Sequence, residues 1–191
     1  MAAAIALRLA IPPGYASPLF PAAGIALACV LMYGPRMLPG IALGSLLSAT
    51  VLSVQGMPKS LEAWALPVTF AVGATLQAWL GAWLVRRRVQ QPLTLSEPAD
   101  IARFLACAVA SCLVSASLAT LALWLRGRAV LGALPFNWGT WFVGDLLGVL
   151  IATPIALSLY ARPREAWAPR RLSVGAHASR RSRVAEGPRR R

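Results

Sequence analysis

Apolar residues gather in five long runs, which dominate the chain. They are residues 17–33, 37–54, 63–85, 104–125 and 138–160. Together they contain 103 of the 191 residues, and Asp145 is their only acidic or basic side chain. A helix needs roughly 20 mainly apolar residues to cross a bilayer core of about 30 Å. Because lipid offers the backbone no hydrogen-bond partner, each run should be helical. The pattern predicts an all-α, polytopic transmembrane helix bundle.

The two ends of the chain differ from these runs. Residues 1–11 are typical of the second half of a hydrophobic helix, and Arg8 within the apolar stretch does not fit a cleaved signal peptide. Residues 161–191 hold ten Arg and few apolar side chains, which is typical of a disordered segment. We therefore expect a membrane domain over 1–160, with about five full helices and an N-terminal half-helix stub. A disordered basic tail should follow over 161–191.

Basic residues are distributed unevenly among the connections between runs. One alternate set holds 15 Lys and Arg: Arg36, Arg86, Arg87, Arg88, Arg103 and the ten of the tail. The other set holds four: Arg8, Lys59, Arg126 and Arg128. The positive-inside rule makes the larger set cytoplasmic, so the C-terminus is predicted to be inside the cell. The net charge of +13 then reflects membrane topology, and we expect lipid rather than nucleic acid as the partner.

Candidate chemistry is sparse. The three cysteines lie within apolar runs and show neither metal-ligand spacing nor a disulfide framework, so we expect no metal and no cofactor. The apolar runs contain no His and no paired carboxylates. The sequence therefore predicts a protein that is not an enzyme.

Small residues recur about four apart in the first four runs, where they should mark the faces on which helices pack. The ridges are Pro21, Gly24 and Ala28; Gly40, Gly44 and Ser48; Gly73, Gln77 and Gly81; and Cys107, Ser111, Ser115 and Ala119. They predict a compact bundle. GxxxG patterns occur at 40–44 and 144–148. This pattern is common in membrane helices, so it leaves open whether the protein forms a homodimer.

The fifth run carries the candidate site. Trp138, Trp141, Asp145, Gly148 and Ala152 share one helical face. A carboxylate at this depth costs about 2.5 to 3.5 kcal/mol on insertion scales and should face the bundle interior. Gln77 is a candidate hydrogen-bond partner, and Arg126 or Arg128 offers an alternative. Asp145 then either locks helix packing or forms a ligand, ion or proton site.

Three patches of sequence resemble one known family. They are Pro18 to Gly24 with the Gly34 to Gly44 stretch, then Gly73 to Arg87, then Trp141 to Pro154. In this order they resemble the bacterial membrane-associated sensor domain of the MASE type, class one. The family's signature positions fall on Pro21, Gly24, Pro39, Gly40, Gly44, Gln77, Trp141, Gly144, Asp145, Gly148 and Pro154.

The resemblance implies a multi-pass sensory module of the bacterial inner membrane that normally precedes a cytoplasmic kinase or cyclic-di-GMP output domain. Against that pattern we expect one N-terminal helix to be incomplete and the output domain to be absent, or supplied by a separate protein. The basic tail then either contacts anionic lipid or marks where a longer signalling protein was interrupted. A small membrane transporter or substrate-capture subunit is the alternative function.

Overall fold

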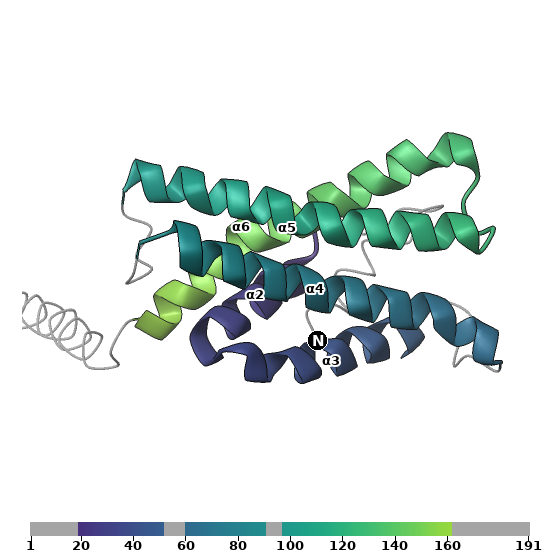
Figure 1. Ribbon diagram of the computed structural model, residues 1–191, viewed down its shortest axis with the longest axis horizontal. Coiled ribbons are helices and arrows are strands. Elements are labelled where there is room, and N and C mark those ends of the chain that lie inside the picture. Colours follow the sequence, from purple (N-terminus) through teal and green to yellow (C-terminus); the bar gives the residue numbers. More distant parts are fainter. Residues whose placement is uncertain (1–18, 52–59, 91–96, 162–191) are drawn as a thin grey trace, which may run out of the picture. The chain divides into compact units, whose positions relative to one another are not determined.

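The computed structural model describes residues 19–51, 60–90 and 97–161. These residues form five α-helices, joined in part by short 3-10 turns (Figure 1). The helices are α2 (Pro21–Tyr33), α3 (Leu38–Val51), α4 (Ala65–Arg88), α5 (Pro98–Leu125) and α6 (Leu134–Ala161). Each lies on one of the five apolar runs, and the described part of the chain contains no strand, so the all-α prediction is confirmed. The half-helix stub and the tail beyond Ala161 lie outside the described residues.

Three of these helical segments are long and apolar enough to cross a bilayer. They are Glu62–Arg88, Pro98–Leu125 and Leu131–Tyr160, with 27, 28 and 30 residues. Helix α2 has 13 residues, which at 1.5 Å per residue gives about 20 Å, less than the bilayer core. Helix α3 is described over 14 residues, and the remainder of its apolar run lies outside the described part.

Two glycines end helices in conformations that other residues rarely adopt. Gly34 follows α2 with a φ of 84°, and its N–H donates to the Val30 carbonyl over 2.9 Å. Gly127 follows α5 with a φ of 63°, and its N–H donates to the Trp124 carbonyl. Positive φ carries no Cβ penalty in glycine. Both glycines therefore allow the chain to reverse directly after a helix.

Helix α4 packs against α2, α3 and α5. Its contacts with α5 are antiparallel, because Gly73 lies near Ser115 whereas Gly81, two turns later, lies near Ser111. The core combines α2, α4, α5 and α6 through buried side chains that include Leu27, Val30, Val85, Phe104, Ala108, Cys112 and Val149. This core surrounds the middle of α6, where Asp145 lies.

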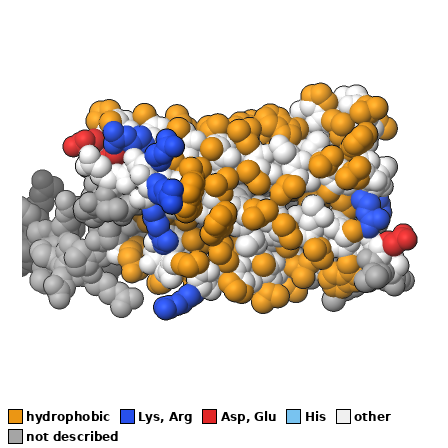
Figure 2. Space-filling model, in the orientation of Figure 1, with side chains coloured by type: hydrophobic (Ala, Val, Ile, Leu, Met, Phe, Trp, Pro, Cys, Tyr) orange, Lys and Arg blue, Asp and Glu red, His pale blue; other side chains and the backbone are white. Residues whose placement is uncertain are grey.

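The outer surface is apolar between two charged ends. On α4 and α6, exposed apolar side chains recur at steps of three or four: Val68, Val72, Leu76, Trp79 and Trp83, then Val143, Leu147, Ile151 and Ile155. Figure 2 shows hydrophobic side chains between groups of Lys and Arg. We call the end that carries Arg86, Arg87, Arg88 and Arg103 the basic end, and the end that carries Glu62, Arg126 and Arg128 the opposite end. A lipid-facing surface has this character.

The predicted packing ridges are buried on α4 and α5, and on α2 at Gly24 and Ala28. The prediction that the ridge on α3 packs against another helix is wrong for its two glycines. Gly40 and Gly44 are exposed, and a Cβ on either glycine would meet nothing within 4 Å. Helix α3 instead turns another part of its surface, which includes Ala42 and Leu46, toward α4. A GxxxG pattern marks where helices can approach, but it cannot tell whether a partner helix lies there.

Candidate functional site

Asp145 lies on α6 at the point where three helices meet. Its side chain is only 4% exposed, as the cost of a carboxylate in the membrane leads one to expect. The Gln77 side-chain amide on α4 and the Ser115 hydroxyl on α5 lie close enough to its carboxylate to act as hydrogen-bond donors. The partner proposed from sequence, Gln77, is therefore in place. The Asp145 carboxylate on α6 therefore faces side chains of both α4 and α5.

Gln77 itself contacts both neighbouring helices. Besides lying near the Asp145 carboxylate, its side-chain Nε2 donates to the Cys112 Sγ on α5 over 3.3 Å, and both side chains are buried. Gly73 and Gly81 flank Gln77 one turn away on either side. A Cβ at Gly81 would lie 3.2 Å from the Ser111 Oγ, so glycine at this position lets α4 and α5 approach closely. We call Asp145, Gln77, Cys112 and Ser115 the Asp145 cluster.

Arg126 and Arg128, the alternative partners, follow α5 in the connection to α6. The Arg126 guanidinium donates to the backbone carbonyl of Glu62 at the opposite end of the bundle. Neither Arg126 nor Arg128 is among the groups that hydrogen bond to the Asp145 carboxylate. The acid is therefore held by neutral donors.

The start of α2 lies directly against the same stretch of α6. The Phe20 N–H donates to the Gly144 carbonyl over 3.1 Å. One turn further along α6, the Gly148 Cα lies against the Phe20 carbonyl with no room for a Cβ. Pro21 occupies the first turn of α2, where its missing N–H costs no hydrogen bond. Helix α2 therefore begins beside Asp145, within the span of α6.

A second backbone approach lies one turn along α2. A Cβ on Gly24 would collide with the Gly148 carbonyl, and the Ala152 Cβ lies 2.9 Å from the same point. The Thr153 hydroxyl donates to the Gly24 carbonyl over 2.9 Å and is fully buried. We call the contacts of Phe20 and Gly24 with Gly144, Gly148 and Thr153 the α2–α6 contact.

Aromatic side chains lie along the first turns of the same α6 face. Trp141 packs on Phe70 of α4 with ring centroids 5.0 Å apart. Trp138 stacks on Phe142 at 5.2 Å, and its Nε1 donates to the Ser117 hydroxyl of α5 over 3.2 Å. The face predicted from spacing is therefore the face that α6 turns toward the other helices.

All the predicted site residues belong to this one region. Trp141, Gly144, Asp145 and Gly148 follow one another along α6, Pro21 and Gly24 meet them from α2, and Gln77 meets them from α4. From sequence, Ser115 and Cys112 count only as small packing residues, and nothing marks Phe20 or Thr153. Ser115 does share a ridge with Ser111, and this placed it on the correct face of α5.

The Asp145 cluster consists of one carboxylate among neutral hydrogen-bonding side chains. Among the described residues no group of three or more His, Cys, Asp or Glu side chains could hold a metal ion. One carboxylate with two neutral donors can exchange a proton or rearrange its hydrogen bonds. Either event would change the contacts of α6 with α4 and α5.

The MASE1 family model matches residues 1–178, nearly the whole chain. No curated protein and no solved structure gives a significant match. The matched region contains all five helices and every residue of the Asp145 cluster and the α2–α6 contact. The chain belongs to the MASE1 family of membrane-associated sensor domains and is a membrane sensory module of the kind that signalling proteins carry.

Proposed function

We propose that the chain senses a stimulus through the Asp145 cluster and passes it along α6 to a cytoplasmic output domain or a separate output protein. The observation that carries this proposal is the burial of one carboxylate between three helices, with donors from α4 and α5. Ionisable residues inside a membrane are costly, and such residues are usually functional. The ligand, or a proton, would act as the stimulus, and the module itself is non-enzymatic.

Transmission would depend on two packings of α6. A ligand shifts an equilibrium only by its different affinities for the two states. Loss of the bond from Gln77 or Ser115 would free the middle of α6, and the α2–α6 contact would carry the change to α2. Since α6 ends at Ala161, next to the basic tail, a shift of this helix is the direct route to any output that follows.

The proposed setting is the bacterial inner membrane with the basic end in the cytoplasm. Residues 1–160 would form the membrane domain, and the Arg-rich residues 161–191 would contact anionic lipid, at about 1 kcal/mol per basic side chain near the surface. The positive-inside rule supports this orientation, because the antiparallel packing of α4 and α5 gathers Arg86, Arg87, Arg88 and Arg103 at one end.

The test is the output of a reporter joined to the full chain. A diguanylate cyclase domain would follow Arg191, and cyclic di-GMP would be measured in cells that carry the wild type or Asp145→Asn. Asparagine keeps the size of the side chain but removes the charge and replaces one acceptor oxygen with an NH2 donor. We expect the cyclic-di-GMP level to change at least about fivefold, the lower end of ordinary coupling between sites.

Glu62→Gln is the matched control, because it makes the same chemical change at an exposed acid of the opposite end. Its output should equal that of the wild type. Ser115→Ala removes one donor and keeps the carboxylate, so it should shift output in the same direction by less. Thermal unfolding in detergent would verify that each variant is folded. A folded Asp145→Asn protein with wild-type output would show that the acid only stabilises packing.

A further inference from the structure

The exposed apolar face of α4 ends in two aromatic side chains and a cation. Its last apolar members are Leu76, Trp79 and Trp83. Arg87 follows Trp83 by one turn, and its guanidinium carbon lies 4.3 Å from the centroid of the Trp83 ring. The face of an aromatic ring attracts a cation that stacks on it. This stacking orients the Arg87 guanidinium and leaves the N–H groups along its edge able to donate.

The cations of the basic end differ in their partners. Arg86 donates to two backbone carbonyls at the end of α2, and Arg103 forms an ion pair with Asp100 at 2.9 Å. Residues 91–96, which lie outside the described part, contain no Asp or Glu. Among the described residues, three exposed cations of this end pair with no carboxylate: Arg36, Arg87 and Arg88.

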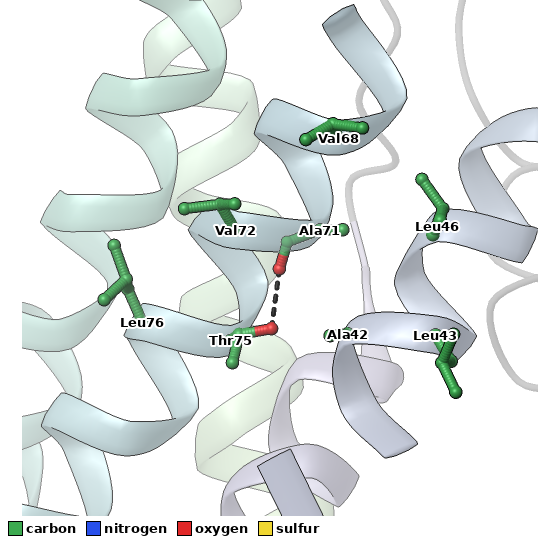
Figure 3. A pocket seen from close by; sticks show the side chains of 8 residues that line it. All are labelled: Ala42, Leu43, Leu46, Val68, Ala71, Val72, Thr75 and Leu76. Atoms are coloured by element: carbon green, nitrogen blue, oxygen red, sulfur yellow. Dashed lines mark hydrogen bonds between the residues drawn. The ribbon is translucent and has the colours of Figure 1, made fainter. Parts of the chain in front are cut away.

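The chain before α3 brings Arg36 to the same level along α4 as Trp83. The Arg86 guanidinium near the end of α4 reaches the end of α2, directly before the chain turns into α3, so α3 runs antiparallel to α4. Figure 3 shows a groove of about 360 Å³ between these two helices, and both Leu43 and Leu76 line it. Arg36 precedes Leu43 by seven residues and Trp83 follows Leu76 by seven, which is about two turns in each case. Two turns from the groove toward the basic end, Arg36 therefore lies on the α3 side and Trp83 on the α4 side.

The distance from this groove to Arg87 matches the depth of one lipid leaflet. Arg87 follows Leu76 by eleven residues, which is about 16 Å at 1.5 Å per residue. Half of the bilayer core is about 15 Å. On the α3 side, Gly40 is exposed and has no side chain that would block an acyl chain. A lipid whose headgroup lies at Arg87 could therefore extend one chain along this face as far as Leu76.

We infer that this end of α3 and α4 binds an anionic glycerophospholipid. We call Arg36, Trp83 and Arg87 the Arg87 site. The lipid phosphate would accept hydrogen bonds from the Arg87 guanidinium and be attracted by Arg36, while one acyl chain lies along Trp83 and Trp79. A planar guanidinium suits a phosphate because two of its N–H groups can donate to two oxygens.

Charge complementarity decides which lipid occupies the Arg87 site. A zwitterionic lipid carries its own cation beside the phosphate, so it gains less from two arginines that lack a carboxylate partner. Basic sites between membrane helices bind anionic headgroups for this reason. Binding does not rest on the proposed function, and it is separate from the lipid contact proposed for residues 161–191, because the Arg87 site belongs to α4 and the start of α3.

Photoreactive lipids test the Arg87 site at the level of single peptides. The full chain would be placed in phosphatidylcholine nanodiscs with a trace of phosphatidylglycerol that carries a diazirine midway along one acyl chain. Phosphatidylcholine with the same modified chain measures contact without net charge, and mass spectrometry identifies the labelled peptides. We expect phosphatidylglycerol to label residues 76–83 at least about fivefold more than phosphatidylcholine, the ratio that corresponds to one basic side chain near a membrane surface. Unlabelled phosphatidylglycerol should compete.

Three exposed positions give the deciding variants. Arg87→Gln should lower the labelling ratio about fivefold. Trp83→Leu removes the ring that orients Arg87 but keeps an apolar side chain, so it should lower the ratio about twofold. Arg88→Gln is the matched control. It removes the same charge one residue further along, where the side chain lies near Cys107 of α5, and it should leave the ratio unchanged.

The tail is identical in all these variants, so it cannot cause a difference between Arg87→Gln and Arg88→Gln. Circular dichroism would verify that each variant is folded. Equal labelling of wild-type residues 76–83 by the two lipids would overturn the inference. Equal losses in Arg87→Gln and Arg88→Gln would also overturn it, because they would show that only the overall charge of the basic end attracts lipid.

Discussion

Glycine at two positions decides how closely α2 can approach α6. Gly24 and Gly148 bring backbone against backbone, and no side chain separates them. Close approach of this kind lets carbonyl groups and a hydroxyl bond across helices, as Thr153 does with Gly24. Because the chain continues from Phe20 into α2 at this point, these glycines also position the start of that helix beside Asp145.

Gly24→Ala should therefore destabilise the protein. The added methyl group would collide with the Gly148 carbonyl, and overpacking of this kind typically costs about 1 to 3 kcal/mol. The unfolding free energy in mixed micelles would measure it. Gly40→Ala is the matched control, since nothing lies within 4 Å of a Cβ there. Alanine favours a helix over glycine, so this control should be neutral or slightly stabilising. Equal effects of the two substitutions would contradict the α2–α6 contact.

At single residues, the sequence reveals what is chemically unusual. One acid among apolar runs had to be buried, and one amide between two glycines was a candidate partner beside Arg126 or Arg128; the structure places Gln77, not Arg126, near Asp145. Ser115 and Thr153 could not be found in this way. A hydroxyl in a membrane helix usually bonds to its own helix, as Thr69 does, and only the neighbouring helix decides otherwise.

Among the helices, α2 is the one that departs most from a simple span. It is short, it begins against α6, and its last turn is held from α4. The Arg86 guanidinium donates to the Val30 carbonyl over 2.7 Å and also lies 3.3 Å from the Leu31 carbonyl. A cation at the C-terminal end of a helix both satisfies free carbonyls and favours the helix dipole. Both ends of α2 are thus held by long helices.

Arg86→Leu should loosen the last turn of α2 and lower stability by roughly 1 kcal/mol, the usual net worth of such a bond. Hydrogen exchange of the backbone amides around Val30 should become faster, because the closing turn loses its cap. Arg88→Leu, on the next but one residue of α4, removes the same charge from the basic end and should leave this exchange unchanged. Unaltered protection in folded Arg86→Leu protein would show that the Gly34 turn alone holds α2.

Over the described residues as a whole, charged side chains lie at the two ends of the bundle, and apolar surface lies between them. The pairing of α4 with α5 brings their Arg residues to one end, whereas the hydrogen bond of Arg126 to Glu62 lies at the other. Membrane insertion retains basic residues in the cytoplasm. The basic end should therefore be cytoplasmic, with both the α4–α5 connection and the C-terminus inside the cell.

Reporter fusions measure this orientation. Alkaline phosphatase, which is active only outside the cytoplasm, should be active when joined after Arg128 and inactive when joined after Gln90 or Arg191. Green fluorescent protein exported in unfolded form does not fluoresce, so its pattern at the three positions should be the reverse. Phosphatase activity after Arg191 would show that the bundle has the reverse orientation. The proposed output route would then lie on the wrong side of the membrane.

The sequence by itself determined the fold class, the five helices and the burial of Asp145. Lipid offers the backbone of an apolar run no hydrogen-bond partner, so the run becomes helical, and a carboxylate exposed to lipid is too costly. The tertiary structure decided which ridges have partners. Gly24 faces Gly148, whereas Gly40 and Gly44 face outward, although the same small-residue spacing marks all of them. It also decided that α2 begins beside Asp145 and that Arg36 lies at the level of Trp83 on α4. These features depend on which helix lies opposite, and residue spacing along one helix carries no such information.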